Sequence, residues 1–100
     1  MMELVPRIQL CADVVDEIVP AYLKRNGLAI HETLGISPGR YTISAYPAGL
    51  RICGFNRMTD AEAAFVELEE VTDWTKAVGE DSARLKPLVV PICDRHGRAT

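Results

Sequence analysis

The chain has 100 residues, of which 48% are hydrophobic and 25% charged, and its formal net charge is −3 at pH 7. This length suits one domain and this composition is ordinary for a globular protein, so we expect a single domain over residues 1–100 and exclude disorder. No apolar stretch approaches the roughly 20 residues of a membrane span, and the amino-terminal residues lack an export pattern, which favours a cytoplasmic protein without membrane association.

Two elements are predicted before residue 28. Hydrophobic and polar residues alternate along residues 2–10, which is typical of a half-buried strand. A helix follows, because apolar residues then recur at helical spacing: Val14, Val15, Ile18, Val19, Tyr22 and Leu23. Asn26-Gly27 closes this helix, and Pro20 is expected to kink it. In the alternative, Pro6 is the first residue of a helix that runs through Val19.

A hairpin is predicted over residues 41–55. Residues 41–46 and 50–55 are two β-prone runs joined by a Pro-Ala-Gly turn. Strict alternation places Arg51, Cys53 and Phe55 together on the outer face of this hairpin. That face is partly apolar and open, so we expect these three residues to contact a partner or a ligand.

The clearest helix is predicted over residues 60–78. Thr59 followed by Glu62 forms a capping box at its start, and Gly79 is a typical helix stop. Its buried stripe consists of Ala61, Ala64, Phe65, Leu68, Val71, Thr75 and Val78. Apolar residues at this spacing cover one side of a helix, so the opposite side faces water.

A last strand is predicted at residues 88–92, which are branched and apolar on both faces, with Pro87 and Pro91 favouring a sheet edge. The resulting order, βαββαβ, is that of a ferredoxin-like α+β sandwich, with two helices on one face of an antiparallel sheet. The alternative amino-terminal helix gives αββαβ instead.

Acidic residues concentrate in the predicted helix. Between Asp60 and Asp81 lie eight acids and one base, a local charge of −7. One water-facing side of the helix collects Glu62, Glu69, Asp73 and Glu80. Together with Trp74, these residues are predicted to bind a protein partner that has a basic surface.

Other patterns predict less. Basic residues collect near the last strand (Arg84, Lys86, Arg95, Arg98) and around the hairpin (Arg40, Arg51, Arg57). Direct nucleic-acid binding is not expected, because the chain is acidic and the hairpin lacks interleaved aromatic residues. Cys11, Cys53 and Cys93 lack paired spacing, which predicts free thiols and no metal site. His31 is expected to be exposed in the connection after residue 28, and no cofactor is expected.

Three functions follow from these features. The favoured one is a non-enzymatic regulatory or inhibitory protein that binds another protein through the acidic helix, the outer sheet face, or both. The second is a homodimeric module that holds a small molecule between sheets or between helix and sheet. The third is a thiol-dependent enzyme that uses Cys93 or Cys53, because Cys93 precedes Asp94 and His96 and a nearby histidine activates a thiol.

Overall fold

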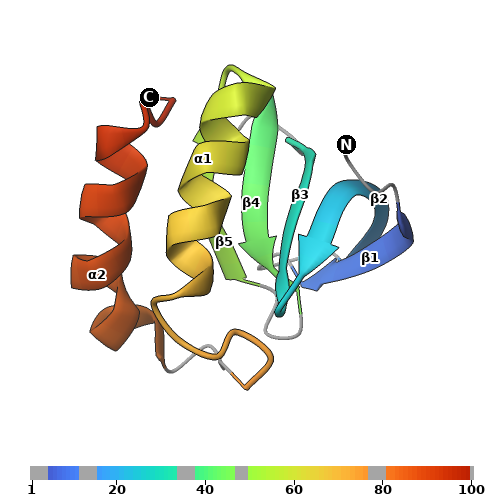
Figure 1. The fold of residues 1–100 in the computed structure, drawn as a ribbon. Coiled ribbons are helices and arrows are strands. Elements are labelled where there is room, and N and C mark those ends of the chain that lie inside the picture. The colour runs from blue at the N-terminus through green and yellow to red at the C-terminus, as the bar shows by residue number, and fades with distance from the viewer. Residues whose placement is uncertain (1–4, 12–15, 34–37, 47–49, 77–80, 100) are drawn as a thin grey trace.

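Five strands precede two helices in the computed structural model (Figure 1). The strands are β1 (Val5–Cys11), β2 (Asp16–Arg25), β3 (Leu28–Glu32), β4 (Tyr41–Ala45) and β5 (Leu50–Phe55), and the helices are α1 (Met58–Glu69) and α2 (Ser82–Arg95). The structure describes residues 5–11, 16–33, 38–46, 50–76 and 81–99, with side chains from Ala21 onward except Ser82.

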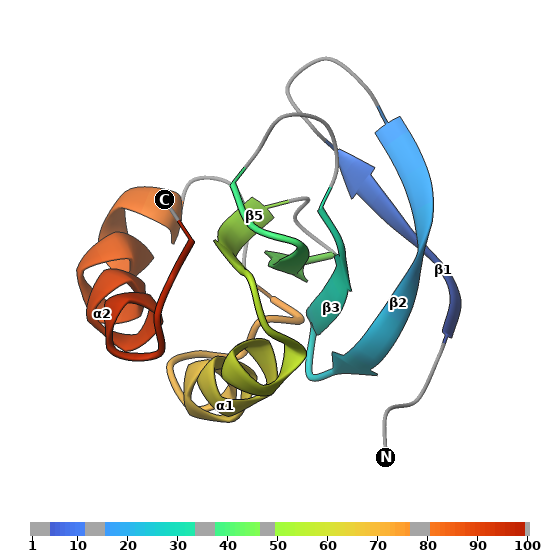
Figure 2. The ribbon, with the colours of Figure 1, turned by 90° about the horizontal axis from the view of Figure 1, so that it is seen from above.

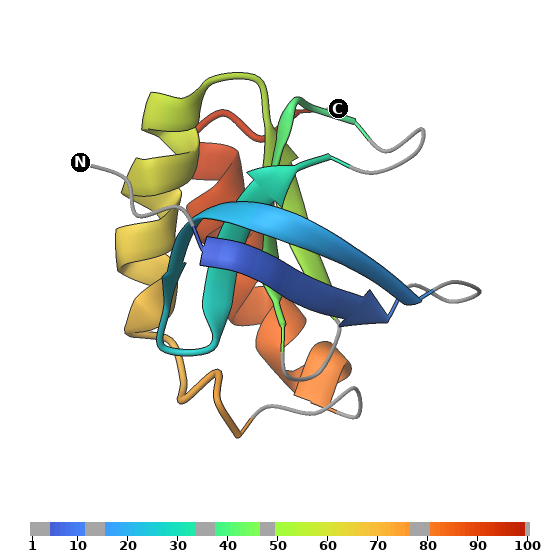
Figure 3. The same cartoon turned by 90° about the vertical axis from the view of Figure 1, so that its right-hand side faces the viewer.

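The strands form one antiparallel sheet in chain order, from β1 to β5. α1 packs across β3, β4 and β5, and α2 packs beside α1 against β5 (Figure 2). Figure 3 looks from the β1 side, with β1 and β2 nearest the viewer and α2 behind the sheet. An antiparallel sheet covered by helices confirms the α+β class.

The order of the elements differs from both orders predicted from the sequence. Residues 16–25 were expected in a helix but form β2, the partner of both β1 and β3. Asn26 and Gly27 have φ angles of 54° and 84° and make the two-residue turn between β2 and β3. Asn-Gly with positive φ at both residues is the favoured hairpin turn, so it continues a sheet here instead of closing a helix.

β1 confirms the predicted amino-terminal strand for the described residues. It lies at the sheet edge, whereas the ferredoxin-like order would have made it central. Its pairing with β2 shifts register between Val5 and Ile8, and Pro6 lies within this irregular stretch. Because proline donates no ladder hydrogen bond, an edge strand with a break in register is where Pro6 fits best.

α1 confirms the first four residues of the predicted buried stripe but is shorter than expected. Val71 and Thr75 lie beyond its end, where Val71 is half-buried and Thr75 is exposed, and Val78 lies outside the described residues. Ala61, Ala64, Phe65 and Leu68 are buried against the sheet. The N-cap is Arg57, which places Thr59 inside the first turn and not at the cap. The helix ends at Glu69, and Trp74 then folds back to donate from Nε1 to the Leu68 carbonyl oxygen at 2.6 Å. This bond supplies a donor to one of the carbonyls that a helix end leaves without an intrahelical partner.

Residues 88–92, which were expected to form a strand, lie inside α2. Leu85, Val89 and Cys93 are buried and four residues apart, so they share one helix face, while Pro87 and Pro91 are exposed. Each proline inside a helix removes one backbone hydrogen bond. Burial of the Leu85–Val89–Cys93 face against the rest of the core offsets that loss.

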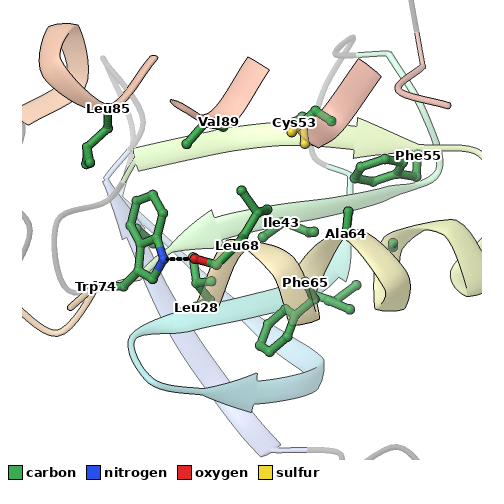
Figure 4. Close-up of a cluster of buried hydrophobic side chains, with 14 residues drawn as sticks. Leu28, Ile43, Cys53, Phe55, Ala64, Phe65, Leu68, Trp74, Leu85 and Val89 are labelled. Carbon is green, nitrogen blue, oxygen red and sulfur yellow. Dashed lines mark hydrogen bonds between the residues drawn. The ribbon is translucent and has the colours of Figure 1, made fainter. Parts of the chain in front are cut away.

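One apolar cluster fills the space between the sheet and the helices (Figure 4). Leu28 and Ile43 project from β3 and β4 toward Phe65 and Leu68 of α1. Trp74, the largest of the fully buried side chains, closes this cluster next to α2. The cluster therefore reaches the interface between β5 and α2, where the candidate site lies.

Candidate functional site

Two acids of α1 are paired with cationic side chains of the chain itself. Glu69 accepts from Arg25 Nε at 2.7 Å and from Asn26 Nδ2 at 2.7 Å, and its side chain is 11% exposed. The hydrogen bond from Arg25 lowers the pKa of Glu69. Glu67 likewise pairs with Arg95 and His96, and these hydrogen bonds lower its pKa. The predicted acidic surface is therefore partly neutralised by the chain itself.

The other residues predicted for partner binding differ in how accessible they are. Trp74 is fully buried, so it offers no surface to a partner, contrary to the prediction. Asp73 is exposed and accepts hydrogen bonds from the backbone N–H and the hydroxyl of Thr75, which lower its pKa. Glu62 is half-buried on α1, and Glu80 lies outside the described residues.

The outer sheet face predicted from residues Arg51, Cys53 and Phe55 does not exist as such. Cys53 is 1% exposed and Phe55 is fully buried, while Arg51 is exposed. Ile43 pairs with Cys53 but the next residue, Ser44, pairs with Arg51, so Ile52 is an extra residue in β5. Such a bulge turns the residues after it to the opposite face, which brings Cys53 and Phe55 into the core.

A pocket of about 230 Å³ opens between β5 and α2, and we call it the β5–α2 pocket. Its lining residues are Leu50, Arg51, Ile52, Trp74, Leu85, Lys86, Val89, Val90 and Arg98. The Trp74 ring lies beside Leu85 and Val89 of α2 (Figure 4). β5 supplies one wall, α2 supplies the other, and Trp74 joins the two.

Three cationic side chains line this apolar pocket, and the described residues of its lining include no acid. Arg51 donates from Nη2 to the Pro38 carbonyl oxygen at 3.1 Å. Because a carbonyl oxygen carries no formal charge, this hydrogen bond does not neutralise the guanidinium of Arg51. Arg98 forms an ion pair with Asp94 at 3.0 Å, and the Asp94 side chain is 53% exposed. Apolar walls with a few cations are suited to a ligand that has an apolar body and a negative charge.

His31 is buried, which corrects the expected exposed connection. It lies in β3, between β2 and β4, and is 1% exposed. Its Nδ1 lies 2.7 Å from the Glu32 carbonyl oxygen and its Nε2 lies 2.8 Å from Ser44 Oγ. Nδ1–H must donate to the carbonyl, so Nε2 accepts from the serine hydroxyl. Burial lowers the pKa of His31, as does the positive charge of Arg51.

The residues that suggested a thiol enzyme are not assembled around Cys93. Cys93 is buried, His96 pairs with Glu67, and Asp94 pairs with Arg98. Cys93 instead lies next to the second candidate nucleophile, Cys53, and each thiol shifts the pKa of the other. The geometry favours chemistry between two sulfurs over histidine-assisted attack.

Sequence reasoning listed Arg51, Lys86 and Arg98 as bases but did not bring them together. The missing step was α2, because Lys86 lies in this helix and Arg98 follows its end, and the helix packs against β5, which carries Arg51. The spacing of Leu85, Val89 and Cys93 was the signal that could have indicated it.

Comparison of the chain with protein-family models, with curated proteins and with solved structures found no match. Neither described helix has the length and apolar content of a membrane-spanning helix. Over the same residues, no group of three or more His, Cys, Asp or Glu side chains is placed to hold a metal ion.

Proposed function

We propose that this chain is a ligand-binding module whose β5–α2 pocket takes small molecules with an apolar body and one anionic group. The observation that carries the proposal is the lining, in which Leu50, Ile52 and Val89 supply apolar walls while Arg51 and Lys86 supply charge. Ligand sites are commonly concave and apolar, with a few polar groups that orient the ligand. One chain lines the pocket, so the proposal does not need the homodimer of the alternative predicted from the sequence.

The volume of the pocket limits the size of the ligand. Sites for drug-sized molecules typically measure about 300 to 1,000 Å³, and the β5–α2 pocket measures about 230 Å³. A medium-chain or aromatic carboxylate therefore suits it better than a nucleotide. The free thiols of Cys53 and Cys93 support a reducing compartment such as the cytoplasm as the place where this ligand is met.

Trp74 allows a direct binding test, because it is the only tryptophan and it lines the pocket. We expect octanoate to change the Trp74 emission saturably. Octanol of the same chain length should bind about tenfold more weakly, since a charged hydrogen bond is worth about 1.5 kcal/mol or more. Octylamine should give no saturable change, because its charge repels the three cations.

Charge removal locates the anion within the pocket. Arg51→Gln and Lys86→Gln should each weaken octanoate binding while leaving octanol binding within about twofold. Arg84→Gln is the matched control, because Arg84 lies on α2, pairs with Asp81 at 3.3 Å and does not line the pocket. Equal binding of octanoate and octanol would refute the anionic ligand, and no saturable response to either would refute the pocket as a binding site.

A role as an interaction protein is a second proposal, supported by a smaller surface than the one predicted. Val66 is 56% exposed on α1, and Glu62 and Glu70 lie one turn away on either side of it. An exposed apolar residue between two acids suits a basic, amphipathic partner segment. Glu69 and Trp74 have no part in this surface, because they are engaged within the fold.

A further inference from the structure

Cys53 of β5 and Cys93 of α2 lie side by side in the core. Both are 1% exposed, both are free thiols, and each shifts the pKa of the other. Figure 4 shows two sulfur atoms next to one another beside the Cys53 label. Two cysteines from distant parts of the chain thus meet in the core, and a disulfide between them requires their sulfurs to approach to about 2 Å.

The two thiols differ in acidity. The hydrogen bond to Cys93 and burial together raise the pKa of Cys53. The hydrogen bond from Cys53 and the nearby positive charge of Arg98 lower the pKa of Cys93. Because the thiolate is the reactive form of cysteine, the lower pKa favours Cys93 as the attacking sulfur of the pair.

The β5–α2 pocket ends next to this pair. Ile52 precedes Cys53 on β5, Val89 lies about one helical turn before Cys93 on α2, and both line the pocket. Arg98 also lines it and lies close enough to affect both thiols. A small oxidant that enters the pocket therefore contacts residues that are adjacent to Cys53 in the chain or one helical turn from Cys93.

We propose that Cys53 and Cys93 are a redox-active pair that a peroxide converts into an intramolecular disulfide between β5 and α2. The Cys93 thiolate attacks one peroxide oxygen, the O–O bond breaks, and the departing hydroxide leaves as water after taking up a proton. Cys93 is now a sulfenic acid. The Cys53 sulfur attacks the Cys93 sulfur, the S–O bond breaks, and a second water leaves. The two thiols lose two electrons and two protons, and the peroxide is reduced to two waters.

The test uses the full chain with Cys11→Ser, which removes the third thiol. After hydrogen peroxide treatment and alkylation in denaturant, we expect a mass loss of two hydrogens, no alkylation, and a crosslink between tryptic peptides 52–57 and 85–95. The midpoint temperature of unfolding should rise by on the order of 10 °C, since the bond restricts the unfolded chain, and dithiothreitol should reverse the rise. Any one of three results would overturn the proposal. These are alkylation of both thiols, a crosslink between chains, and a sulfinic acid at Cys93 without a crosslink. If Cys11→Ser does not fold, the same peptide mapping on the natural chain gives the same decision.

Single variants test the separate roles of the two sulfurs. In Cys53→Ser the sulfenic acid of Cys93 has no resolving thiol, so dimedone should label Cys93 after peroxide treatment. In Cys93→Ser the remaining thiol, Cys53, has no partner of lower pKa and should react at least tenfold more slowly. Equal labelling of the two variants would overturn the assignment of Cys93 as the nucleophile. Octanoate binding is measured separately, so failure of the pocket proposal leaves this result intact.

Discussion

The buried imidazole of His31 resists protonation in the folded chain, and this gives stability a defined pH dependence. Burial lowers the pKa of His31 from its ordinary value of 6.5, and Arg51 adds to the effect. Below pH 6.5 the unfolded chain takes up a proton that the folded chain resists, so the free energy of unfolding falls as the pH drops below this value. Urea unfolding at pH 7, 6 and 5 should show a steady decrease.

Replacement of each histidine identifies the group that is responsible. His31→Gln should flatten the decrease between pH 6.5 and 5, whereas His96→Gln should keep it. Glu67, Glu69 and Asp73 have lowered pKa values, so their contributions to stability are lost only at more acidic pH and do not enter this window. An unfolding free energy that stays constant from pH 7 to 5 in the natural chain would show that His31 accepts a proton in the folded state.

At the scale of elements, the turn between β2 and β3 is tied to the segment after α1. Gly27 has a φ of +84°, and a Cβ there would lie 2.5 Å from the carbonyl carbon of Trp74. Gly27→Ala should therefore cost at least about 2 kcal/mol, from both backbone strain and the clash. Gly97→Ala is the matched control, because its φ is +81° but its Cβ would meet nothing closer than Asp60 Oδ2 at 3.8 Å. Equal losses of unfolding free energy for Gly27→Ala and Gly97→Ala, measured by denaturant unfolding, would contradict a close contact between Gly27 and Trp74.

Elements with strong local periodicity could be predicted from the sequence. The hairpin of β4 and β5 follows from alternating residues, and α1 follows from apolar residues every three or four positions. β2 and α2 were assigned to the wrong type, because each is an apolar stretch interrupted by proline that fits more than one period. The Asn26-Gly27 turn was the local signal that separates the alternatives for β2.

The candidate site could be predicted only in its parts. The extra residue Ile52 turns Cys53 and Phe55 into the core, and strict alternation gives no indication of a bulge. The β5–α2 pocket depends on how α2 packs against β5, a strand that is not its neighbour in the sequence. Contacts of that kind are set by tertiary packing, and local propensity carries no information on them.

At the scale of the whole molecule, an ion pair and a hydrogen bond link the helical layer to the sheet. Glu69, at the end of α1, accepts from Arg25 and Asn26 at the turn between β2 and β3. Glu69→Ala should lower the free energy of unfolding by about 1 to 2 kcal/mol, because a mostly buried, charged hydrogen-bond group is lost while Arg25 stays partly hydrated. Its neighbour Glu70 is exposed, so Glu70→Ala should stay within about 0.5 kcal/mol. A similar loss of unfolding free energy in both variants would contradict the role of Glu69 in linking α1 to the sheet.

The order of the elements also affects how the chain is made. Each strand pairs with the strand just before it, so the sheet can assemble from short-range contacts while the chain is still being synthesised. Both helices that cover it follow in sequence. Until residues 58–95 have left the ribosome, Leu28, Ile30 and Ile43 lie on a sheet face with nothing over it, and exposed apolar surface of this kind attracts chaperones and other nascent chains.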